Sequence, residues 1–301
     1  MTDFASDPKP TNTSLRLVEA REAISNRLWG SGDLAFNHNV LAQLSLPYRS
    51  QGEQRSFLRS SGAADLRVEA GAVPRAGGGF VEVGIPYGPK ARLILILLST
   101  LAVKTQSRTV EVDTSFRRFV ESCGITMSGK NNRAMKEQLL RLSAVSMRLA
   151  ITRQGVVDVY QGPIFNHFQV ELPNDPRQQF LWNSEVSFSQ GFYDSLSRNA
   201  VPLERDAVIA LKHSARALDI YTWLASRLFR LKSPTTIRWT SLRHQFGTPS
   251  QGIESFKRAF ATAMKTALMV YPEAKVESVF GGIRISPSLP PVPTRSQRRL
   301  M

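Results

Sequence analysis

Residues 84–103 read GIPYGPKARLILILLSTLAV, and the fold is decided in this stretch. Six consecutive aliphatic residues, from Leu93 to Leu98, follow two prolines and two cations. The run ends before Lys104, at about half of the roughly 20 apolar residues that a transmembrane helix needs. Prolines are tolerated in the first turn of a helix, and the leucines recur at helical spacing. The stretch therefore predicts a buried helix of a globular domain and not a membrane span.

The composition limits which classes of protein the chain can belong to. A chain of 301 residues, of which 42% are hydrophobic, is long enough for two globular domains with separate cores. The N-terminus, MTDFASDPKPTNTS, lacks the cationic start and the apolar segment of a secretory signal. Cys123 is the only cysteine, which excludes a disulfide framework and a cysteine-based zinc site. We expect a cytoplasmic protein that has no membrane partner.

The net charge of +15 is concentrated in two parts of the chain. Residues 86–153 hold 12 basic and 4 acidic residues, and residues 203–301 hold 16 and 6. The remaining residues hold 11 basic and 14 acidic ones, so their net charge is −3. Charge that serves solubility alone would be spread evenly. Two separate cationic blocks indicate two surfaces for a polyanion, and the most fitting polyanion is nucleic acid.

Two blocks, beginning at Ala91 and Ala215, run through the same order of elements. Each has a long apolar helix, a short β-rich piece, a hydroxyl-capped helix, a glycine turn, another helix and two β-like runs around a glycine. This is the order of a winged helix-turn-helix domain. The sequence therefore predicts the α+β class, with two tandem winged helix-turn-helix domains and an N-terminal helical extension. Positive φ angles are expected at the glycines of the two turns, Gly124, Gly129, Gly247 and Gly252.

The residues outside the two blocks complete the predicted division of the chain into segments. Ser14 is expected to cap an amphipathic helix that reaches Trp29. Residues 49–79 read as connecting material with one short strand at residues 65–69. The predicted segments are a disordered tail (1–13), an N-terminal helical extension and linker (14–79), a first winged-helix domain (80–172), a connecting segment (173–202), a second winged-helix domain (203–286) and a flexible, proline-rich basic tail (287–301).

The helix that follows each glycine turn has one apolar and one basic face. Met135, Leu139 and Leu142 mark the core side of the first helix, and Phe256 and Phe260 mark that of the second. A helix of this kind can enter a major groove, with residues near its N-terminus at the base edges, while the wings offer arginines to phosphates. A merely solvated polar face is the alternative for each residue. The predicted DNA-binding residues are Lys130, Asn131, Asn132, Arg133, Lys136 and Arg153 in the first block, and Gln251, Lys257, Arg258, Lys265 and Arg284 in the second.

No pattern of catalytic residues stands out. GITMSGKN, residues 124–131, nearly matches a phosphate-binding loop, but the residues before it have helical spacing, whereas such a loop follows a strand. Asn131 also lacks the hydroxyl that would bind Mg²⁺. No histidines show metal-ligand spacing, and no paired carboxylates suggest polymerase chemistry. We predict no catalytic residue, no cofactor and no metal. The histidines, expected to cap helices or lie in the core, are His38, His167, His213 and His244; the tyrosines considered as nucleophiles are Tyr48, Tyr87 and Tyr193.

Several motifs together resemble the RepA C-terminal family of plasmid replication initiators. They are LPYR (46–49), GIPYGPKARLILILLSTLAVKTQS (84–107), the spacing from Phe116 to Ile125, EQLLRLSA (137–144) and SARALDIYTWLASRL (214–228). The resemblance implies a bacterial protein that binds direct repeats (iterons) of double-stranded DNA at a plasmid origin and helps to open an AT-rich region. It also implies recruitment of the host initiator and helicase, repression of its own promoter, and a homodimer formed through the first domain.

Two other functions are compatible with the same sequence. A tandem winged-helix transcriptional repressor would need no replication role. An enzyme that nicks or primes origin DNA would need a metal or tyrosine constellation. Several direct repeats beside the gene favour initiation, whereas a single inverted repeat over a promoter favours repression.

Overall fold

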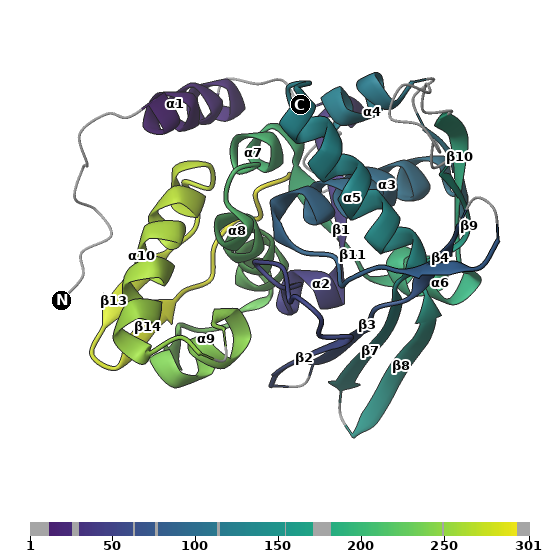
Figure 1. The fold of residues 1–301 in the computed structure, drawn as a ribbon. Helices are drawn as coiled ribbons and strands as arrows, with labels where there is room; N and C mark the ends of the chain where they lie inside the picture. Colours follow the sequence, from purple (N-terminus) through teal and green to yellow (C-terminus); the bar gives the residue numbers. More distant parts are fainter. Residues whose placement is uncertain are drawn as a thin grey trace. The chain divides into compact units, whose positions relative to one another are not determined.

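The computed structural model describes residues 12–25, 30–62, 64–75, 78–112, 115–153, 155–170, 182–248 and 250–293. These residues divide into two compact units (Figure 1). Unit 1 comprises the described parts of residues 1–45 and 201–301, and unit 2 comprises those of residues 46–200. Nearly all of the predicted tail of residues 1–13 lies outside the described residues.

Unit 2 is built around α3 (Gly88–Thr105), the helix predicted from the aliphatic run. Pro89 lies in its first turn, where no backbone donor is needed. Leu93, Ile94 and Leu98 are among its buried residues, so the prediction of a core helix is confirmed. Among the described residues, no helix is long and apolar enough to cross a membrane.

The elements after α3 follow the predicted winged helix-turn-helix order. They are β6 (Thr109–Glu111), α4 (Phe116–Ser122), α5 (Gly129–Ala144), β7 (Ser146–Arg153) and β8 (Val156–Pro163). Ser115 and Ser128 cap α4 and α5 by accepting hydrogen bonds from the backbone N–H groups of Arg118 and Asn131. Since a helix and not a strand precedes Gly124, the geometry of a phosphate-binding loop is absent from this described segment.

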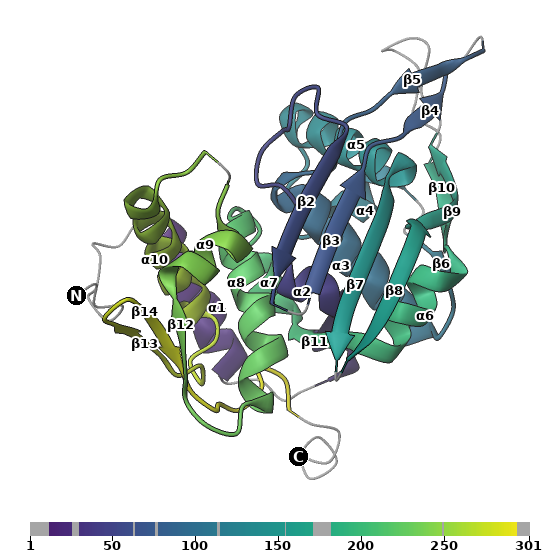
Figure 2. The ribbon, with the colours of Figure 1, turned by 90° about the horizontal axis from the view of Figure 1, so that it is seen from below.

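The segment predicted as connecting material contains strands of the main sheet of unit 2. β2 (Ser56–Ser61) and β3 (Ala64–Glu69) extend the β7–β8 hairpin into an antiparallel sheet of order β2-β3-β7-β8, which Figure 2 shows face on. Only β3 was predicted, so the linker interpretation of residues 49–79 is wrong. In β3, Leu66 and Val68 are buried while Asp65 and Arg67 are exposed, because one face of the sheet covers the helices and the other meets solvent. β4 (Ala72–Pro74) and β5 (Phe80–Glu82) form a separate hairpin.

A second sheet occupies part of the segment predicted as a connection between the domains. β10 (Trp182–Phe188) pairs with both β6 and β9 (Phe165–Val170), in the order β6-β10-β9. α6 (Gln190–Asn199) then packs on β8. Residues 182–199 are therefore part of unit 2. They do not form a plain spacer, because β10 is the strand with which β6 pairs.

Unit 1 contains the second winged helix-turn-helix, in the predicted order. It runs through α8 (Ala215–Arg227), the 3-10 turn Leu228–Arg230, β12 (Thr235–Arg238), α9 (Trp239–Phe246), α10 (Ile253–Met269), β13 (Val276–Val279) and β14 (Gly282–Ile285). The three strands form one antiparallel sheet of order β12-β14-β13. Tyr221 and Trp223 of α8 lie in the core, as predicted. The predicted fold class is thus confirmed in both units.

The N-terminal residues pack within unit 1. α1 (Asn12–Ser25) contacts α7 (Arg205–Ala210) and α10, and α2 (Asn39–Gln43) contacts α8. β1 (Leu34–His38) pairs with β11 (Ala200–Glu204). Because α1 begins before Ser14, that residue is not its cap, and residues 26–29 at the predicted end of the helix lie outside the described residues. Leu17 is buried, but Leu15 and Val18 are exposed, so only a narrow stripe of α1 meets the core.

Two further predictions need correction. Residues 287–293, predicted as the start of a flexible tail, are held on unit 1: Val292 is buried, and the hydroxyl of Tyr271 donates to the carbonyl oxygen of Leu289 (2.7 Å).

Of the four turn glycines, only Gly124 has a positive φ (71°). Gly247 instead allows a close approach, since a Cβ there would lie 2.4 Å from the carbonyl oxygen of Arg243.

His38 is a helix cap, as predicted, whereas His167, His213 and His244 are exposed and therefore not core residues. The Nδ1 atom of His38 accepts a hydrogen bond from the N–H of Val40 (3.2 Å) at the start of α2. Burial lowers the pKa of His38 from 6.5 to about 4, because the charged imidazolium would lose its hydration.

The low pKa of His38 predicts a loss of stability in weak acid. Between pH 6.5 and 4 the unfolded chain binds a proton that the folded chain does not, so stability falls as the pH decreases. From pH 7 to pH 5 this one group should cost about 2 kcal/mol. Urea unfolding at both pH values should show that H38N, whose amide oxygen can still cap the helix, loses that much less stability than the wild type. An equal loss in both proteins would contradict this assignment.

Candidate nucleic-acid interface

α10 presents a cationic stripe opposite a firmly packed face. Its buried face contains Phe256 and Phe260, whose ring centroids are 5.5 Å apart. Phe260 also meets the rings of Trp239 (5.9 Å) and Phe246 (5.6 Å) from α9. This aromatic cluster fixes the rotation of α10 about its axis. On the opposite side Arg258 is exposed and Lys265 is half-exposed, two turns apart.

Two of the predicted residues near the start of α10 already have protein partners. The Nζ atom of Lys257 lies 2.6 Å from a carboxylate oxygen of Glu254. The side chain of Gln251 accepts a hydrogen bond from Arg216 (3.3 Å), and its backbone carbonyl accepts one from Nε of Arg243 (2.8 Å). These bonds fix the turn before α10, so Gln251 acts as a support for the helix in this conformation.

The β13–β14 hairpin forms the wing of unit 1. Arg284 is exposed on β14, opposite Glu277 in the strand register, with a charge separation of 3.8 Å. Arg238 of β12 is exposed and stands opposite Gly282, which places it on the same face of the sheet as Arg284. The wing therefore adds exposed cations to those that α10 gives unit 1.

In unit 2 the exposed side of α5 is also basic. Lys130 and Arg133 are exposed, while Met135, Leu139 and Leu142 are fully buried on the other side. Lys136 is half-buried over the ring of Phe116, 5.6 Å from its centroid, and burial lowers its pKa. The pKa of Lys90 at the start of α3 is lowered by burial and by the positive charge of Lys130. Lys90 carried no signal in the sequence, because the starts of α3 and α5 meet only in the folded chain.

The two asparagines predicted to read bases lie toward the core side of α5. The side-chain amide of Asn131 donates to the carbonyl oxygen of Thr126 (2.8 Å), which ties down the preceding turn. The Oδ1 atom of Asn132 is buried. In unit 2 the exposed cations, and not these amides, are therefore the side chains available to a ligand. The wing position Arg153 ends β7, and its side chain lies outside the described part of the chain.

The GIPYG motif holds α5 in place. The guanidinium of Arg141 donates to the carbonyl oxygen of Ile85 (2.9 Å), pairs with Glu137 (2.8 Å) and lies over the ring of Tyr87, 5.0 Å from its centroid. The N–H of Tyr87 donates to the side chain of Gln138 (2.8 Å). A Cβ at Gly84 would lie 2.4 Å from the Arg141 guanidinium, so the first glycine of the motif makes room for this cation.

The LPYR motif is held by the arginine of GPKAR. Arg92 is only 5% exposed and donates hydrogen bonds to the carbonyl oxygens of Leu46 (2.6 Å), Pro47 (3.2 Å) and Gly88 (2.8 Å). Its guanidinium also lies over the ring of Tyr48, 5.2 Å from the centroid. Two motifs that are distant in sequence therefore meet at a single buried cation.

Two of the tyrosines considered as nucleophiles, Tyr48 and Tyr87, contact other groups of unit 2. Burial and the nearby Glu137 carboxylate raise the pKa of Tyr87, whereas an activated nucleophile needs a lowered pKa. The ring of Tyr48 packs against two arginines, Arg59 and Arg92. In the part of the chain that the structure describes, no group of three or more histidine, cysteine or acidic side chains could hold a metal ion.

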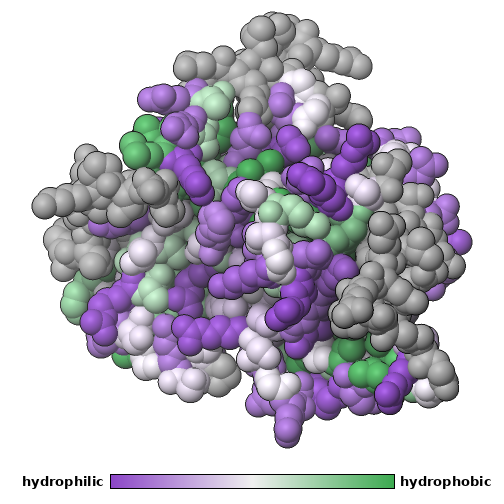
Figure 3. Space-filling model, turned by 45° about the horizontal axis from the view of Figure 1, so that its top comes forward, coloured by the Kyte–Doolittle hydropathy of each residue, from purple (hydrophilic) through white to green (hydrophobic). Residues whose placement is uncertain are grey.

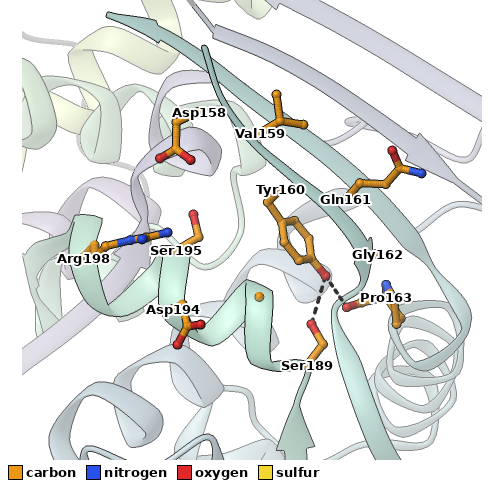
Figure 4. Close-up of a pocket in the computed structure, with 11 residues that line it drawn as sticks. Asp158, Val159, Tyr160, Gln161, Gly162, Pro163, Ser189, Asp194, Ser195 and Arg198 are labelled. Atoms are coloured by element: carbon orange, nitrogen blue, oxygen red, sulfur yellow. Dashed lines mark hydrogen bonds between the residues drawn. The ribbon is translucent and has the colours of Figure 1, made fainter. Parts of the chain in front are cut away.

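A cavity of 360 Å³ lies between β8 and α6 of unit 2. Its wall includes Asp158, Tyr160, Asp194 and Arg198 (Figure 4). The Tyr160 hydroxyl donates to the carbonyl oxygen of Pro163 and lies 3.0 Å from the Ser189 hydroxyl. Burial raises the pKa of Tyr160. None of the predicted DNA-binding residues lines this cavity.

Both helix-turn-helix elements thus combine a rigid core face with an exposed cationic face. Figure 3 shows one face of the molecule on which hydrophilic residues cover most of the coloured surface and hydrophobic ones form small, separate areas. Residues 85–241, just over half of the chain, match the model of the family described as plasmid encoded RepA protein. The chain belongs to this family. The resemblance to the RepA family is thereby confirmed, and the chain is placed among plasmid replication initiators.

Solved structures support the same fold for this RepA family member. The chain is similar to a selenomethionine crystal structure of domain 2 and domain 3 of RctB, with a TM-score of 0.52, 10% identity, and coverage of 84% of this chain and 99% of that one. A second structure of RctB domains 2–3 gives a TM-score of 0.51, 10% identity, and coverage of 82% and 94%. At this identity the similarity concerns the fold alone. No curated protein sequence matches the chain significantly.

Proposed function

We propose that this RepA family member binds iterons at its plasmid origin through α10 and the wing of unit 1, assisted by the cationic side of α5 in unit 2. The observation that carries the proposal is the stripe of Arg258 and Lys265 on a helix that an aromatic cluster holds with this side outward. A helix with such a face fits a major groove. Arg258, near the N-terminal end of α10, is best placed to reach a guanine edge.

The other cations supply contacts to phosphates. Arg238 and Arg284 lie on the wing sheet of unit 1, and Lys90, Lys130 and Arg133 lie in the first turns of α3 and α5 in unit 2. Contacts of this kind carry no sequence information but position the protein and make its affinity fall steeply with salt. Each unit would occupy its own groove, and successive major grooves on one face of a duplex are about 10 base pairs apart.

Removing the α10 stripe tests the interface. In the R258A/K265A double variant we expect at least about a 30-fold loss of affinity for origin DNA, because two lost contacts of roughly 1–3 kcal/mol each remove about 2 kcal/mol or more. The negative slope of log K against log salt should also become shallower, by about 1 for each of these cations that neutralises a phosphate. Fluorescence anisotropy with labelled fragments of the DNA that flanks the gene measures both quantities.

The matched control removes two cations from another surface. Arg67 and Arg148 face each other across β3 and β7 on the exposed side of the unit 2 sheet. The R67A/R148A variant should bind nearly as the wild type does. If both double variants lose affinity equally, the charge as a whole and not the α10 stripe supports binding, and the assignment of the reading helix fails.

The initiator role itself needs a replication readout. We propose that the bound protein promotes opening of an AT-rich region, recruits the host initiator and helicase, represses its own promoter and forms a homodimer, all in the bacterial cytoplasm and without an enzymatic step. A plasmid that carries the gene and its flanking DNA should be maintained with the wild type and lost with R258A/K265A. Promoter repression without maintenance would favour the tandem winged-helix repressor, and Mg²⁺-dependent cleavage of supercoiled origin DNA would favour an enzyme.

A further inference from the structure

Phe280 is the most exposed large hydrophobic residue among the described ones. Its relative exposure is 106%, whereas the exposed leucine at position 289 of the same unit reaches 64%. It occupies the turn of the β13–β14 hairpin, at the tip of the wing. A single exposed apolar residue is common on protein surfaces. Phe280 differs from such residues because its backbone is held in one conformation.

The tip of the wing is held in one conformation. Gly281 has a φ of 80°, which favours glycine. A Cβ on Gly282 would lie 2.0 Å from the carbonyl oxygen of Ile237, so the hairpin is pressed against β12. The N–H of Trp239 donates to the carbonyl oxygen of Gly281 (3.0 Å) and thereby joins the tip to the start of α9. Phe280 is therefore presented to solvent by a supported turn.

The small sheet that has Phe280 at its tip carries exposed arginines, of which Arg284 faces Glu277. Arg238 and Arg284 lie on the exposed face of the same small sheet. Residues 228–286 contain nine lysines and arginines but only three acidic residues. An exposed aromatic ring at the tip of a sheet that carries exposed arginines matches a nucleic-acid groove, which has anionic edges and apolar base faces, better than it matches an apolar protein surface. Trp239 links this hairpin to α10 through its contact with Phe260, so the wing and α10 form one rigid reading surface.

We propose that Phe280 is a minor-groove wedge, which enters the groove next to the one that α10 occupies and partly unstacks a base step. This inference rests on the proposed function, because it requires α10 to lie on DNA. Apolar side chains used in this way kink the duplex toward the major groove. Flexible pyrimidine–purine steps such as TA are deformed most readily, so the wedge would favour such a step beside the site that α10 reads.

The test compares F280A with the wild type on fragments of the DNA that flanks the gene. We expect F280A to bind about 10-fold more weakly, with an unchanged salt slope because no charge is lost. The bend angle from circular permutation should decrease. A 2-aminopurine reporter at the contacted step, found by footprinting, should brighten with the wild type but not with F280A. F280W, which keeps a ring, should retain the brightening, and L289A serves as the control for an exposed apolar residue of the same unit.

The outcomes separate the wedge from the proposed function. If the wild type shows no preference for any flanking fragment over unrelated DNA, the proposed function and the wedge fail together. If the wild type binds specifically and F280A matches its affinity, bend angle and reporter signal, only the wedge fails. A loss of affinity in F280A with an unchanged reporter and bend angle would also overturn the wedge, because Phe280 would then contact DNA without unstacking it.

Discussion

Methionine at position 92 is expected to lower the free energy of unfolding of unit 2 by about 2–5 kcal/mol, because buried carbonyl groups lose their donors. Arg92 satisfies carbonyl oxygens of Leu46, Pro47 and Gly88 and stacks on Tyr48, so a single side chain joins the LPYR segment to α3. Methionine fills a similar volume but donates no hydrogen bond. The R92K variant should be intermediate, since an ammonium cannot reproduce the planar fork of a guanidinium.

Hydrogen exchange provides the readout for R92M, since it reports each unit separately. Amides of residues 46–200 should exchange faster while those of residues 201–293 keep their protection. R148M is the matched control, because Arg148 is exposed on β7 and its loss should leave stability within about 0.5 kcal/mol. Unchanged protection in R92M would show that the two motifs do not depend on this cation.

Alanine at position 282 is expected to damage the wing of unit 1. Its Cβ would lie 2.0 Å from the backbone carbonyl oxygen of Ile237, and a backbone atom cannot turn aside as a side chain can. The β12–β14 pairing must open or shift, at a cost of about 2–4 kcal/mol. We expect faster hydrogen exchange in β12, β13 and β14, and weaker DNA binding, because Arg284 and Phe280 depend on this hairpin.

Two other glycines calibrate the G282A result. Gly252 has an ordinary φ of −63°, and a Cβ at this position would meet no atom of the described residues within 4 Å, so G252A should cost at most about 1 kcal/mol, from the poorer N-cap that alanine makes for α10. Gly281 has space but a φ of 80°, so G281A should cost about 1 kcal/mol. If G282A proves as stable as G252A, the close contact between β14 and β12 is wrong.

The sequence was informative wherever a pattern is local. The aliphatic run at Leu93, the core residues Tyr221 and Trp223 and the order of elements in both blocks could be predicted, because helical periodicity and turn residues act over a few neighbours. β2 was missed because a buried cation, Arg59, interrupts its apolar alternation. Its neighbour β3 pairs with β7, a segment far along the chain, and no local pattern reports such a pairing.

The candidate site was predictable only in part. Arg133, Arg258 and Lys265 follow from the helical wheel, and the structure places all three on the predicted sides of their helices. Whether a polar residue is already engaged cannot be seen on a wheel: Gln251 and Asn131 bind groups of their own unit, and Lys257 binds a carboxylate. Phe280 carried no signal, because its exposure depends on how the glycines after it hold the turn.

The pairing of β1 with β11 affects the order in which the two units can fold during synthesis. The whole of unit 2 is translated between these two strands, so it can complete its sheets on the ribosome while β1 still waits for a partner. Unit 1 can close only when the second part of its sequence has emerged, and α10 is among the last elements made. Synthesis in chain order therefore allows unit 2 to fold before unit 1, and α10 can pack in unit 1 only after β11 has been made.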